Sequence, residues 1–275
     1  MRAGGELILA ADSRVLMEGD ELRSLFDREV RCDPPDIPGY HVERVGSIVR
    51  HIGPTEWCIL YARPEVEEIE RVIREQIEAF PPAGRFLEWK VYSHDGLPEL
   101  SRGLAEHGFR SRPHETLMIR DLEVDRSPGR VSEGVEVRRV QSETEFQDFA
   151  AVDLAAFGTI DPVHLEEIHG RIADPRVGLY LAYVDGQPAG GGRVEVETGK
   201  SFAGLWGGGT APAFRRRGIY RELVRVRAEF ARSRGARYLY VEAIDTTSRP
   251  LLEKMGFTPL AGVEGWVLGS DGTLP

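Results

Sequence analysis

A glycine-rich strand, a basic turn and an amphipathic helix, in that order, constrain the fold of this chain more than any other feature. Residues 205–210 read LWGGGT, and the turn Arg215-Arg216-Arg217-Gly218 then leads into apolar residues with helical period, at Ile219, Leu223, Val226 and Phe230. Such a turn exposes unpaired N–H groups at the positive end of the helix dipole, here among permanent cations. The general alternative is a solvated charge run. The position between strand and helix favours an anion site, with pyrophosphate the natural ligand.

Length and composition indicate an ordinary globular protein with room for two domains. The chain has 275 residues, enough for two separate cores. Its longest apolar runs fall short of the roughly 20 residues of a membrane-spanning helix, and residues 1–14 lack the long apolar segment of a signal peptide. We therefore expect a cytoplasmic protein with no membrane partner. The net charge of −10 argues against nucleic acid as the main partner.

The cysteines and histidines do not indicate a metal site. Cys32 and Cys58 have neither metal-ligand spacing nor the number needed for a disulfide framework. His164 and His169 lie at a spacing that does not place two ligands on one face of a helix. We expect no metal cofactor.

The second half of the chain predicts a mixed order of strands and helices. A strand over 135–140 precedes a capping box at Ser142–Glu145, whose helix is expected to bury Phe146, Phe149, Leu154 and Phe157. A second helix follows over 162–172. Next we expect a three-stranded antiparallel meander at 180–184, 189–196 and 201–210. After it we expect a helix at 218–233, a strand at 237–244, a helix at 248–255 and a strand at 265–268.

The first half predicts a similar alternation. The expected elements are a helix at 20–30, a hairpin of strands 42–52 and 57–61 joined at Gly53-Pro54, a helix at 65–80, a strand at 86–92, a helix at 98–107 and a strand at 116–119. The polar segment Asp125–Gly134 has the composition of a linker. We place the domain boundary near residue 130, giving domains 1–130 and 131–275.

The second half resembles the GCN5-related N-acetyltransferase (GNAT) superfamily. Arg215-Arg216-Arg217-Gly218-Ile219-Tyr220 is similar to its acyl-CoA signature, Arg/Gln-x-x-Gly-x-Gly/Ala, and Asp245–Phe257 is similar to its second motif. The resemblance implies an α/β fold with a mixed sheet and acetyl-CoA as co-substrate. It assigns coenzyme A binding to Gly209, Thr210, Ala211, Arg215, Arg216, Arg217, Gly218, Ile219, Tyr220, Asp245 and Ser248.

Two positions depart from the family pattern. Tyr220 stands where a small residue is usual, and Leu252 stands where many members carry a tyrosine that protonates the leaving thiolate. The second departure leaves the general acid unassigned. Water is an alternative proton source, because the pKa of a thiol is about 8.5.

An internal repeat extends the resemblance to the first half. Pro64 precedes Gly108-Phe109 by 44 positions, and Pro212 precedes Gly256-Phe257 by the same 44, with strand, helix, strand and helix between them. On that spacing Glu67-Glu68-Ile69-Glu70 falls where the basic turn stands, and its carboxylates would repel a pyrophosphate. We expect two tandem acyl-CoA N-acyltransferase folds. The first is expected to be degenerate, without a coenzyme A motif, and to wall off part of the acceptor cleft.

Two further residues are candidates for the chemistry. In the family the strand at 201–210 splays from its neighbour, and an N–H near Gly209 faces the thioester oxygen as an oxyanion donor, for which the glycines allow close approach. On the strand 237–244, alternation places Tyr238, Tyr240 and Glu242 on one face, and Glu242 is the first candidate for the general base. A structural, ion-paired glutamate is the alternative. Asp153, Glu166 and Glu195 are further acceptor-site candidates.

These observations predict an enzyme that moves an acetyl group from acetyl-CoA to a primary amine. The chain offers no Ser/His/Asp or Cys/His set with persuasive spacing, so direct attack in a ternary complex is expected rather than an acyl-enzyme. The partner is expected to be a small-molecule amine, and the protein a monomer or homodimer. Two alternatives stay open. One is a catalytically silent acyl-CoA or small-ligand sensor, and the other is a transferase acting on a protein N-terminus or lysine.

Overall fold

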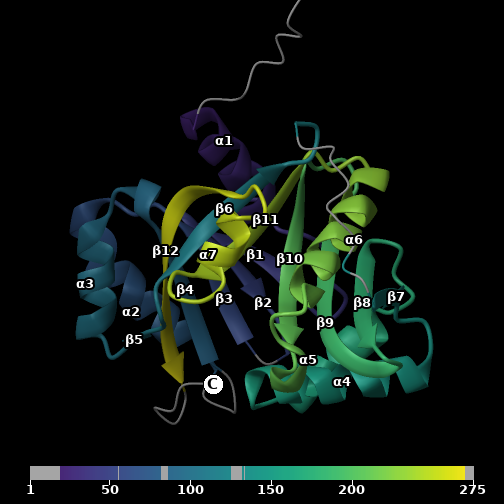
Figure 1. Cartoon of the computed structure of the whole chain (residues 1–275). Coiled ribbons are helices and arrows are strands. Elements are labelled where there is room, and N and C mark those ends of the chain that lie inside the picture. The colour runs from purple at the N-terminus through teal and green to yellow at the C-terminus, as the bar shows by residue number, and fades with distance from the viewer. Residues whose placement is uncertain (1–18, 55, 82–85, 125–131, 133, 270–275) are drawn as a thin grey trace, which may run out of the picture.

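The computed structural model describes residues 19–54, 56–81, 86–124, 132 and 134–269. These residues form a mixed α/β structure around one sheet of twelve strands (Figure 1). The strands are β1 His41–Val45, β2 Ile48–Ile52, β3 Glu56–Ala62, β4 Phe86–Tyr92, β5 Arg110–Ser111, β6 Glu115–Asp121, β7 Val135–Arg139, β8 Val177–Val184, β9 Gln187–Val196, β10 Phe202–Thr210, β11 Tyr238–Ile244 and β12 Thr258–Gly269. The α-helices are α1 Gly19–Phe26, α2 Ile69–Ala79, α3 Pro98–Glu106, α4 Glu143–Phe157, α5 Pro162–Gly170, α6 Ile219–Ser233 and α7 Arg249–Glu253. The described residues also form a short π-helix, η1 Asp27–Arg31, and the 3₁₀ helices η2 Val66–Glu68, η3 Ser93–Asp95 and η4 Pro212–Phe214.

The strands lie in the order β1-β2-β3-β4-β12-β6-β11-β10-β9-β8-β7, with β5 paired to β12. Figure 1 shows this order running from β7 and β8 through β10 and β11 to β6, β12 and β4. Neighbours are antiparallel except at β3–β4 and β10–β11, which are parallel. Each half of the chain therefore contributes one parallel pair to a common sheet.

The two halves exchange their last strands. β6 belongs to the first half by sequence, yet it pairs with β11 along its whole length, from Glu115 opposite Ile244 to Asp121 opposite Tyr238. β12 closes the second half, yet its residues from Val263 to Gly269 pair with β4. Shifting the sequence by the 148 positions that separate Pro64 from Pro212 lays residues 110–121 on β12. The exchange is therefore reciprocal and follows the internal repeat.

Helices cover both faces of the sheet. Leu239 and Ala243 of β11 pack against α6 and α7, and Leu87 and Trp89 of β4 pack against α2 and α3 on the same face. The alternate residues of these strands point to the opposite face. There Phe26 of α1 packs with aromatic residues of β4, β10 and β11, and α4 and α5 pack on β8.

Most predicted elements are present, and the capping box at Ser142 is confirmed, because its side chain accepts a hydrogen bond from Glu145 N. Two predictions are wrong in detail. Residues 42–52 form two strands rather than one, because Gly46, with φ of 58°, allows a tight turn between β1 and β2. Leu154 and Phe157 are 48% and 53% exposed, because the last turn of α4 extends beyond the core to a cleft. The boundary predicted near residue 130 lies outside the described residues.

Across the ranges given above, the structure contains no helix both long and apolar enough to cross a membrane.

The shared sheet predicts that both halves unfold together. Leu117 of β6 is fully buried beside β11 and β12, so Leu117→Ala should lower the free energy of unfolding by about 2–5 kcal/mol. Urea unfolding followed by tryptophan fluorescence and by far-UV circular dichroism should give one coincident transition, shifted to lower urea in the variant. Two separate transitions, with only one of them shifted, would show that the halves fold independently.

Candidate functional site

The parallel strands β10 and β11 separate partway along their length. Their register runs only from Phe202 opposite Tyr238 to Gly204 opposite Tyr240. On its other side β10 breaks register with β9 between Trp206 and Gly209, where the chain bulges through Gly207, whose φ is 54°. A glycine run favours such a bulge, because it lacks side chains to pack and tolerates positive φ. The split leaves backbone groups of β10 and β11 available to a ligand.

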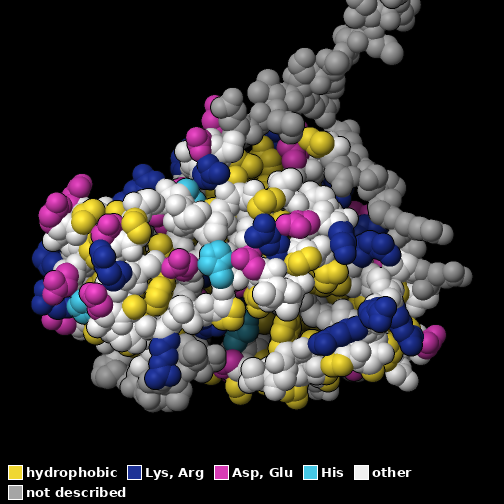
Figure 2. Space-filling model, turned by 60° about the vertical axis from the view of Figure 1, so that its left-hand side comes forward, with side chains coloured by type: hydrophobic (Ala, Val, Ile, Leu, Met, Phe, Trp, Pro, Cys, Tyr) yellow, Lys and Arg dark blue, Asp and Glu magenta, His cyan; other side chains and the backbone are white. Residues whose placement is uncertain are grey.

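The basic turn caps α6 with unusual backbone geometry. Gly218 is the N-cap residue, with φ of 80°, and Arg216 has φ of 67°. A side chain at position 218 would also collide with Ser132, since an added Cβ would lie 2.3 Å from the Ser132 Oγ. Arg215, Arg216 and Arg217 are exposed. Figure 2 shows Lys and Arg side chains gathered on the right-hand side of the face it presents.

A cavity of about 1020 Å³ runs from this turn to the split between β10 and β11. We call it the turn cavity. Of the residues predicted from sequence, it is lined by Gly209, Thr210, Arg215, Arg216, Gly218, Ile219, Tyr220, Glu242 and Ser248. The structure therefore brings together most of the predicted set.

Three predicted binding residues do not line the turn cavity. Ala211 is buried, and Arg217 lies over the Phe214 ring at 5.8 Å from its centroid. Asp245 accepts hydrogen bonds from Thr116 and pairs with His114 Nδ1 at 2.8 Å, so its carboxylate ties β6 to the end of β11. Their assignment to coenzyme A stays a prediction.

A second cavity, of about 520 Å³, lies on the other face of the sheet between the two halves. We call it the inner chamber. Its walls include η1, β3 and β4 from the first half and α4, α5, β9 and β10 from the second, and Tyr40 closes one side by donating a hydrogen bond to Glu167 at 3.1 Å. The chamber and the turn cavity share seven lining residues, Glu56, Glu88, Lys90, Phe157, Trp206, Gly207 and Glu242. We call these shared residues the junction, because the two cavities adjoin there.

Glu242 lies at the junction with both carboxylate oxygens engaged. Lys90 pairs with Oε2 and the Tyr92 hydroxyl donates to Oε1, and the Lys90 and Glu242 side chains are only 15% and 9% exposed. Burial alone would raise the pKa of Glu242, but the Lys90 ammonium and the two hydrogen bonds hold the pKa below its ordinary value. The residue is thus an ionised, paired carboxylate, the alternative that sequence reasoning weighed beside a general base.

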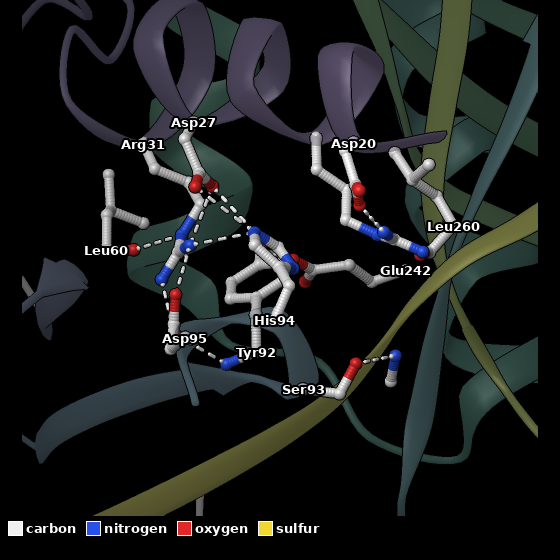
Figure 3. A network of polar contacts seen from close by, with 12 residues as sticks. Asp20, Asp27, Arg31, Leu60, Tyr92, Ser93, His94, Asp95, Glu242 and Leu260 are labelled. Carbon is white, nitrogen blue, oxygen red and sulfur yellow. Dashed lines mark hydrogen bonds and ion pairs between the residues drawn. The ribbon is translucent and has the colours of Figure 1, made fainter. Parts of the chain in front are cut away.

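A polar cluster behind Tyr92 supports this pair (Figure 3). Arg31 binds Asp95 through two hydrogen bonds of 2.8 Å, binds Asp27 at 2.7 Å, and lies over the Tyr92 ring at 4.0 Å from its centroid. His94 Nε2 contacts Asp27 at 3.0 Å. Asp27, His94 and Asp95 have the spacing of metal ligands, but the buried Arg31 guanidinium already supplies the positive charge they need. The cluster, one guanidinium shared by two carboxylates, therefore holds Arg31 in place against the Tyr92 ring.

Other ionisable groups of the chamber have shifted pKa values. Burial raises the pKa of Glu56, and the neighbouring Glu88 carboxylate raises it further. Burial lowers the pKa of His51 to about 4, against the opposing effect of Glu167 and Glu195, so His51 is neutral at pH 7. Burial likewise raises the pKa of Asp153.

The acceptor-site candidates are only partly brought together. Asp153 and Glu195 line the inner chamber, whereas Glu166 is exposed on α5 and its neighbour Glu167 faces the chamber instead. Sequence reasoning expected the first half to wall off part of the acceptor cleft but did not name the residues. Those that line the chamber are Tyr40, His51, Glu56, Glu88, Lys90 and Tyr92. One signal was present. Glu88, Lys90 and Tyr92 share one face of the predicted strand 86–92, and charged residues on one face of a central strand indicate a polar cavity.

The residue at the position of the unassigned acid, Leu252, lies away from the turn cavity. Leu252 is fully buried in the core against α6. Tyr220 instead lines the turn cavity, and its ring packs under the bulge, where an added Cβ on Gly208 would lie 2.9 Å from Tyr220 Cε2. Behind it Arg227 is 1% exposed and donates to Arg193 O and Leu223 O.

Comparison with known families matches residues 140–257 to the Acetyltransferase (GNAT) family. The match contains β8, β9, β10, the basic turn, α6, β11 and α7. No curated protein matches the sequence of the chain.

Solved structures match nearly the whole chain. A GCN5-related N-acetyltransferase from Kribbella flavida is 17% identical, with 90% of this chain and 93% of that chain covered and a TM-score of 0.63. A tandem GNAT protein from the clavulanic acid biosynthesis pathway is 15% identical, with coverage of 86% and 85% and a TM-score of 0.60. A GCN5-related N-acetyltransferase from Sphaerobacter thermophilus is 17% identical, with coverage of 83% and 82% and a TM-score of 0.57. The predicted fold of two tandem units on a mixed sheet is confirmed.

The buried pair at the junction predicts a strong effect of removing its cation. Lys90→Met leaves the Glu242 charge buried and uncompensated, so it should lower the free energy of unfolding at pH 7 by about 3–5 kcal/mol. In the unmodified protein the lowered pKa of Glu242 stabilises the fold at pH values above 4.5, which is the ordinary pKa of a glutamate. This stabilisation is lost as the pH falls through the lowered pKa. In the Lys90→Met variant burial raises the pKa of Glu242, so part of the buried charge is neutralised at pH 5. The loss in free energy of unfolding should therefore be smaller at pH 5 than at pH 8. Urea unfolding at both pH values measures this.

The control for this variant is Arg138→Met, which removes the fully exposed partner of Glu136 on β7 and should leave the free energy of unfolding unchanged within error. Equal deficits in the two variants would contradict the role given to Lys90.

Proposed function

Because residues 140–257 match the model of the Acetyltransferase (GNAT) family, we propose that the protein transfers an acetyl group from acetyl-CoA to a primary amine. The amine attacks the thioester directly while both substrates are bound. The observation that carries this proposal is the pair of adjoining cavities, one running from the basic turn to the split between β10 and β11, and the other being the inner chamber. One substrate can enter from each end and meet the other at the junction.

The turn cavity suits coenzyme A from its phosphates to its thioester. The N-terminus of α6, with Gly218 at its cap, would hold the pyrophosphate through backbone N–H groups, and Arg215 and Arg216 would add charge. Beyond Gly204 the edge of β10 that faces β11 is unpaired, and it offers backbone groups to the pantetheine amides. A backbone N–H near Gly209 would then face the thioester oxygen as it gains charge.

Two carboxylates are proposed as the general base. Glu242 lies at the junction, but its lowered pKa and its two hydrogen bonds make it a weak proton acceptor. Glu56 lines both cavities, and its pKa is raised by burial, toward the range in which a base works at neutral pH. Because its pKa is raised while that of Glu242 is lowered, Glu56 is the better proton acceptor, acting directly or through water. The ion pair of Glu242 and Lys90 then sets the electrostatic potential around Glu56.

The leaving thiolate also needs a proton. The Tyr220 ring lies under the bulge at Gly208 and lines the turn cavity, whereas Leu252 has no polar group to offer. We therefore propose Tyr220 or a water molecule as the proton source.

The first half is proposed to act as the wall of the acceptor site. It lacks the basic turn, since Glu68 and Glu70 stand where the repeat places Arg216 and Gly218. It contributes Tyr40, His51, Glu56 and Lys90 to the inner chamber.

A catalytically silent acyl-CoA binding protein is the second candidate. Its support is specific, because Glu242 is already ion-paired and Leu252 is buried where many family members carry a tyrosine. The enclosed chamber of about 520 Å³ favours a small acceptor over a lysine or N-terminus of a folded protein.

The function is tested at the basic turn. Arg216→Glu combined with Gly218→Glu places two carboxylates at the phosphate position, so it should weaken acetyl-CoA binding by at least about 100-fold, or about 2.7 kcal/mol. Titration calorimetry measures the affinity, and thiol release from acetyl-CoA with a panel of amines measures the activity. Circular dichroism checks that the fold is kept.

The matched control lies in the first half, where Glu68→Arg combined with Glu70→Gly makes the reverse exchange at the equivalent turn. This control should leave affinity and activity unchanged. Retained acetyl-CoA affinity in the Arg216/Gly218 variant would refute the phosphate site. Tight binding of acetyl-CoA by the unmodified protein, with no thiol release from any amine, would support the silent binder.

The base assignment predicts a difference in pH dependence. Glu56→Gln should lower kcat by about 100-fold or more and remove the acidic limb of the pH–rate profile, in which activity falls as Glu56 is protonated. Glu242→Gln should keep that limb, because Glu56 is still present. Initial rates of thiol release from pH 5 to pH 9 measure both, and loss of the limb in Glu242→Gln alone would assign the base to Glu242.

A further inference from the structure

Two arginines of the inner chamber share one carboxylate. Arg171 of the segment after α5 and Arg193 of β9 both contact Glu195 Oε1, at 3.0 Å and 2.8 Å. Arg171 also contacts Glu167 at 3.3 Å, and Glu167 accepts the hydrogen bond from Tyr40. The two guanidinium groups thus lie side by side in one wall of the chamber.

Nitrogens of both guanidinium groups lack partners. Arg193 Nη1 and Arg171 Nε are buried and have no hydrogen-bond partner within the described residues. The side chains are 10% and 7% exposed. A buried donor left without a partner is costly, and a guanidinium edge with free N–H groups fits a carboxylate closely. Arg193 Nη1 is such a donor on a residue that lines the chamber, and it therefore points to an anionic ligand.

The neighbouring cations of the chamber are already neutralised. Arg31 binds Asp27 and Asp95, Lys90 binds Glu242, and Arg176 binds Asp174 at 2.9 Å and Glu197 at 3.3 Å. Lys200 is likewise paired, with Asp33 at 3.2 Å. Arg193 is paired too, with Glu195, but unlike these cations it keeps an unpartnered nitrogen, so an incoming anion is expected to approach Arg193.

Arg193 also lies close to the reaction point. The register of β9 and β10 places it directly opposite Trp206, the residue before Gly207 at the bulge. Neighbouring strands are separated by about 4.8 Å, so an anion on Arg193 and a group at the junction are only a few bonds apart. The junction itself has an excess of negative charge, with Glu56, Glu88 and Glu242 around Lys90, and it therefore attracts an ammonium group.

We propose that the acceptor is an amino acid or a close analogue, with its carboxylate bound by Arg193 and its amino group held at the junction. This inference rests on the proposed acetyl transfer and names the substrate class of that site. Arg193 is then the residue that selects amines carrying a carboxylate. The chamber volume of about 520 Å³ suits a molecule of this size.

The first test compares matched acceptors. Thiol release from acetyl-CoA is measured with glycine, phenylalanine, lysine and glutamate, and with the α-carboxamide of each, at equal concentrations of the neutral amine. At least one acid should exceed its carboxamide by about 100-fold in kcat/KM. Equal rates for every acid and its carboxamide would overturn the proposal.

The second test uses variants of the chamber wall. Arg193→Gln should reduce kcat/KM of the preferred acid to the level of its carboxamide, mainly through KM, and leave the carboxamide rate and the KM for acetyl-CoA unchanged. Arg176→Gln is the control, because Arg176 also lines the chamber but is fully paired, and it should keep the preference. Equal losses for acid and carboxamide in Arg193→Gln would overturn the proposal.

Two measurements keep the inference separate from its premises. Arg193→Lys retains a cation beside Glu195, so if Arg193→Gln does not fold, the lysine variant should fold and keep only part of the preference.

Calorimetric titration of the same amino acids and carboxamides into the unmodified protein needs no catalysis. Binding of the acid alone, lost in Arg193→Lys or Arg193→Gln, would support the carboxylate site even if no thiol is released and the proposed transfer fails. Binding of neither ligand in the presence of coenzyme A would overturn it.

Discussion

The pairing of β6 with β11 and of β12 with β4 is the interaction on which the rest of the structure depends. Backbone hydrogen bonds across these pairs turn two similar units into one sheet, so neither unit has its own closed set of strands. The sheet then places β3 and β4 of the first half against the same interior space as β9 and β10 of the second, and the inner chamber lies there. A site between two domains that merely touched would depend on their packing, whereas this one is fixed by strand register.

Buried charge at the junction follows from the same arrangement. Glu242 comes from the second half, and its two partners, Lys90 and Tyr92, come from β4 of the first. Tyr92 is in turn held by Arg31, which is neutralised by Asp27 and Asp95. Because a charge this deeply buried needs partners fixed in place, the electric field at the junction is set jointly by both halves.

Local signals in the sequence predicted most of the elements. The period of Ile219, Leu223 and Phe230, the capping box at Ser142 and the glycine run before the basic turn each depend on near neighbours in the chain, and each is present in the structure. The two-strand split of residues 42–52 was missed, because Gly46 in a tight turn resembles a glycine within a strand. Exposed Phe157 was taken for a core residue, because a helix that leaves the core keeps its apolar period at the edge of a cleft.

The exchange of strands could not be predicted in the same way. The alternation of residues 115–121 is the same whether that strand pairs with its own half or with the other, so the pattern predicts a strand and leaves its neighbours open. For the same reason most residues predicted for the turn cavity do line it, because they come from segments close together in the sequence. Tyr40, His51 and Glu56 come from the other half, and the sequence analysis did not assign them to the site. Their place is set by long-range pairing, and the repeat suggested only that the first half would form a wall.

The contacts of β6 also bear on how such a chain can change over generations. The acidic turn of the first half, at Glu68 and Glu70, is exposed and free to vary. Its last strand is not, because Thr116 and His114 hold Asp245 and Leu117 packs beside Glu242. A shortened gene encoding only residues 131–275 would leave β11 without β6 and β12 without β4, so the edge of β11 would stay open unless β12 moved to cover it. Duplication followed by strand exchange would thus favour keeping both copies, since each completes the sheet of the other.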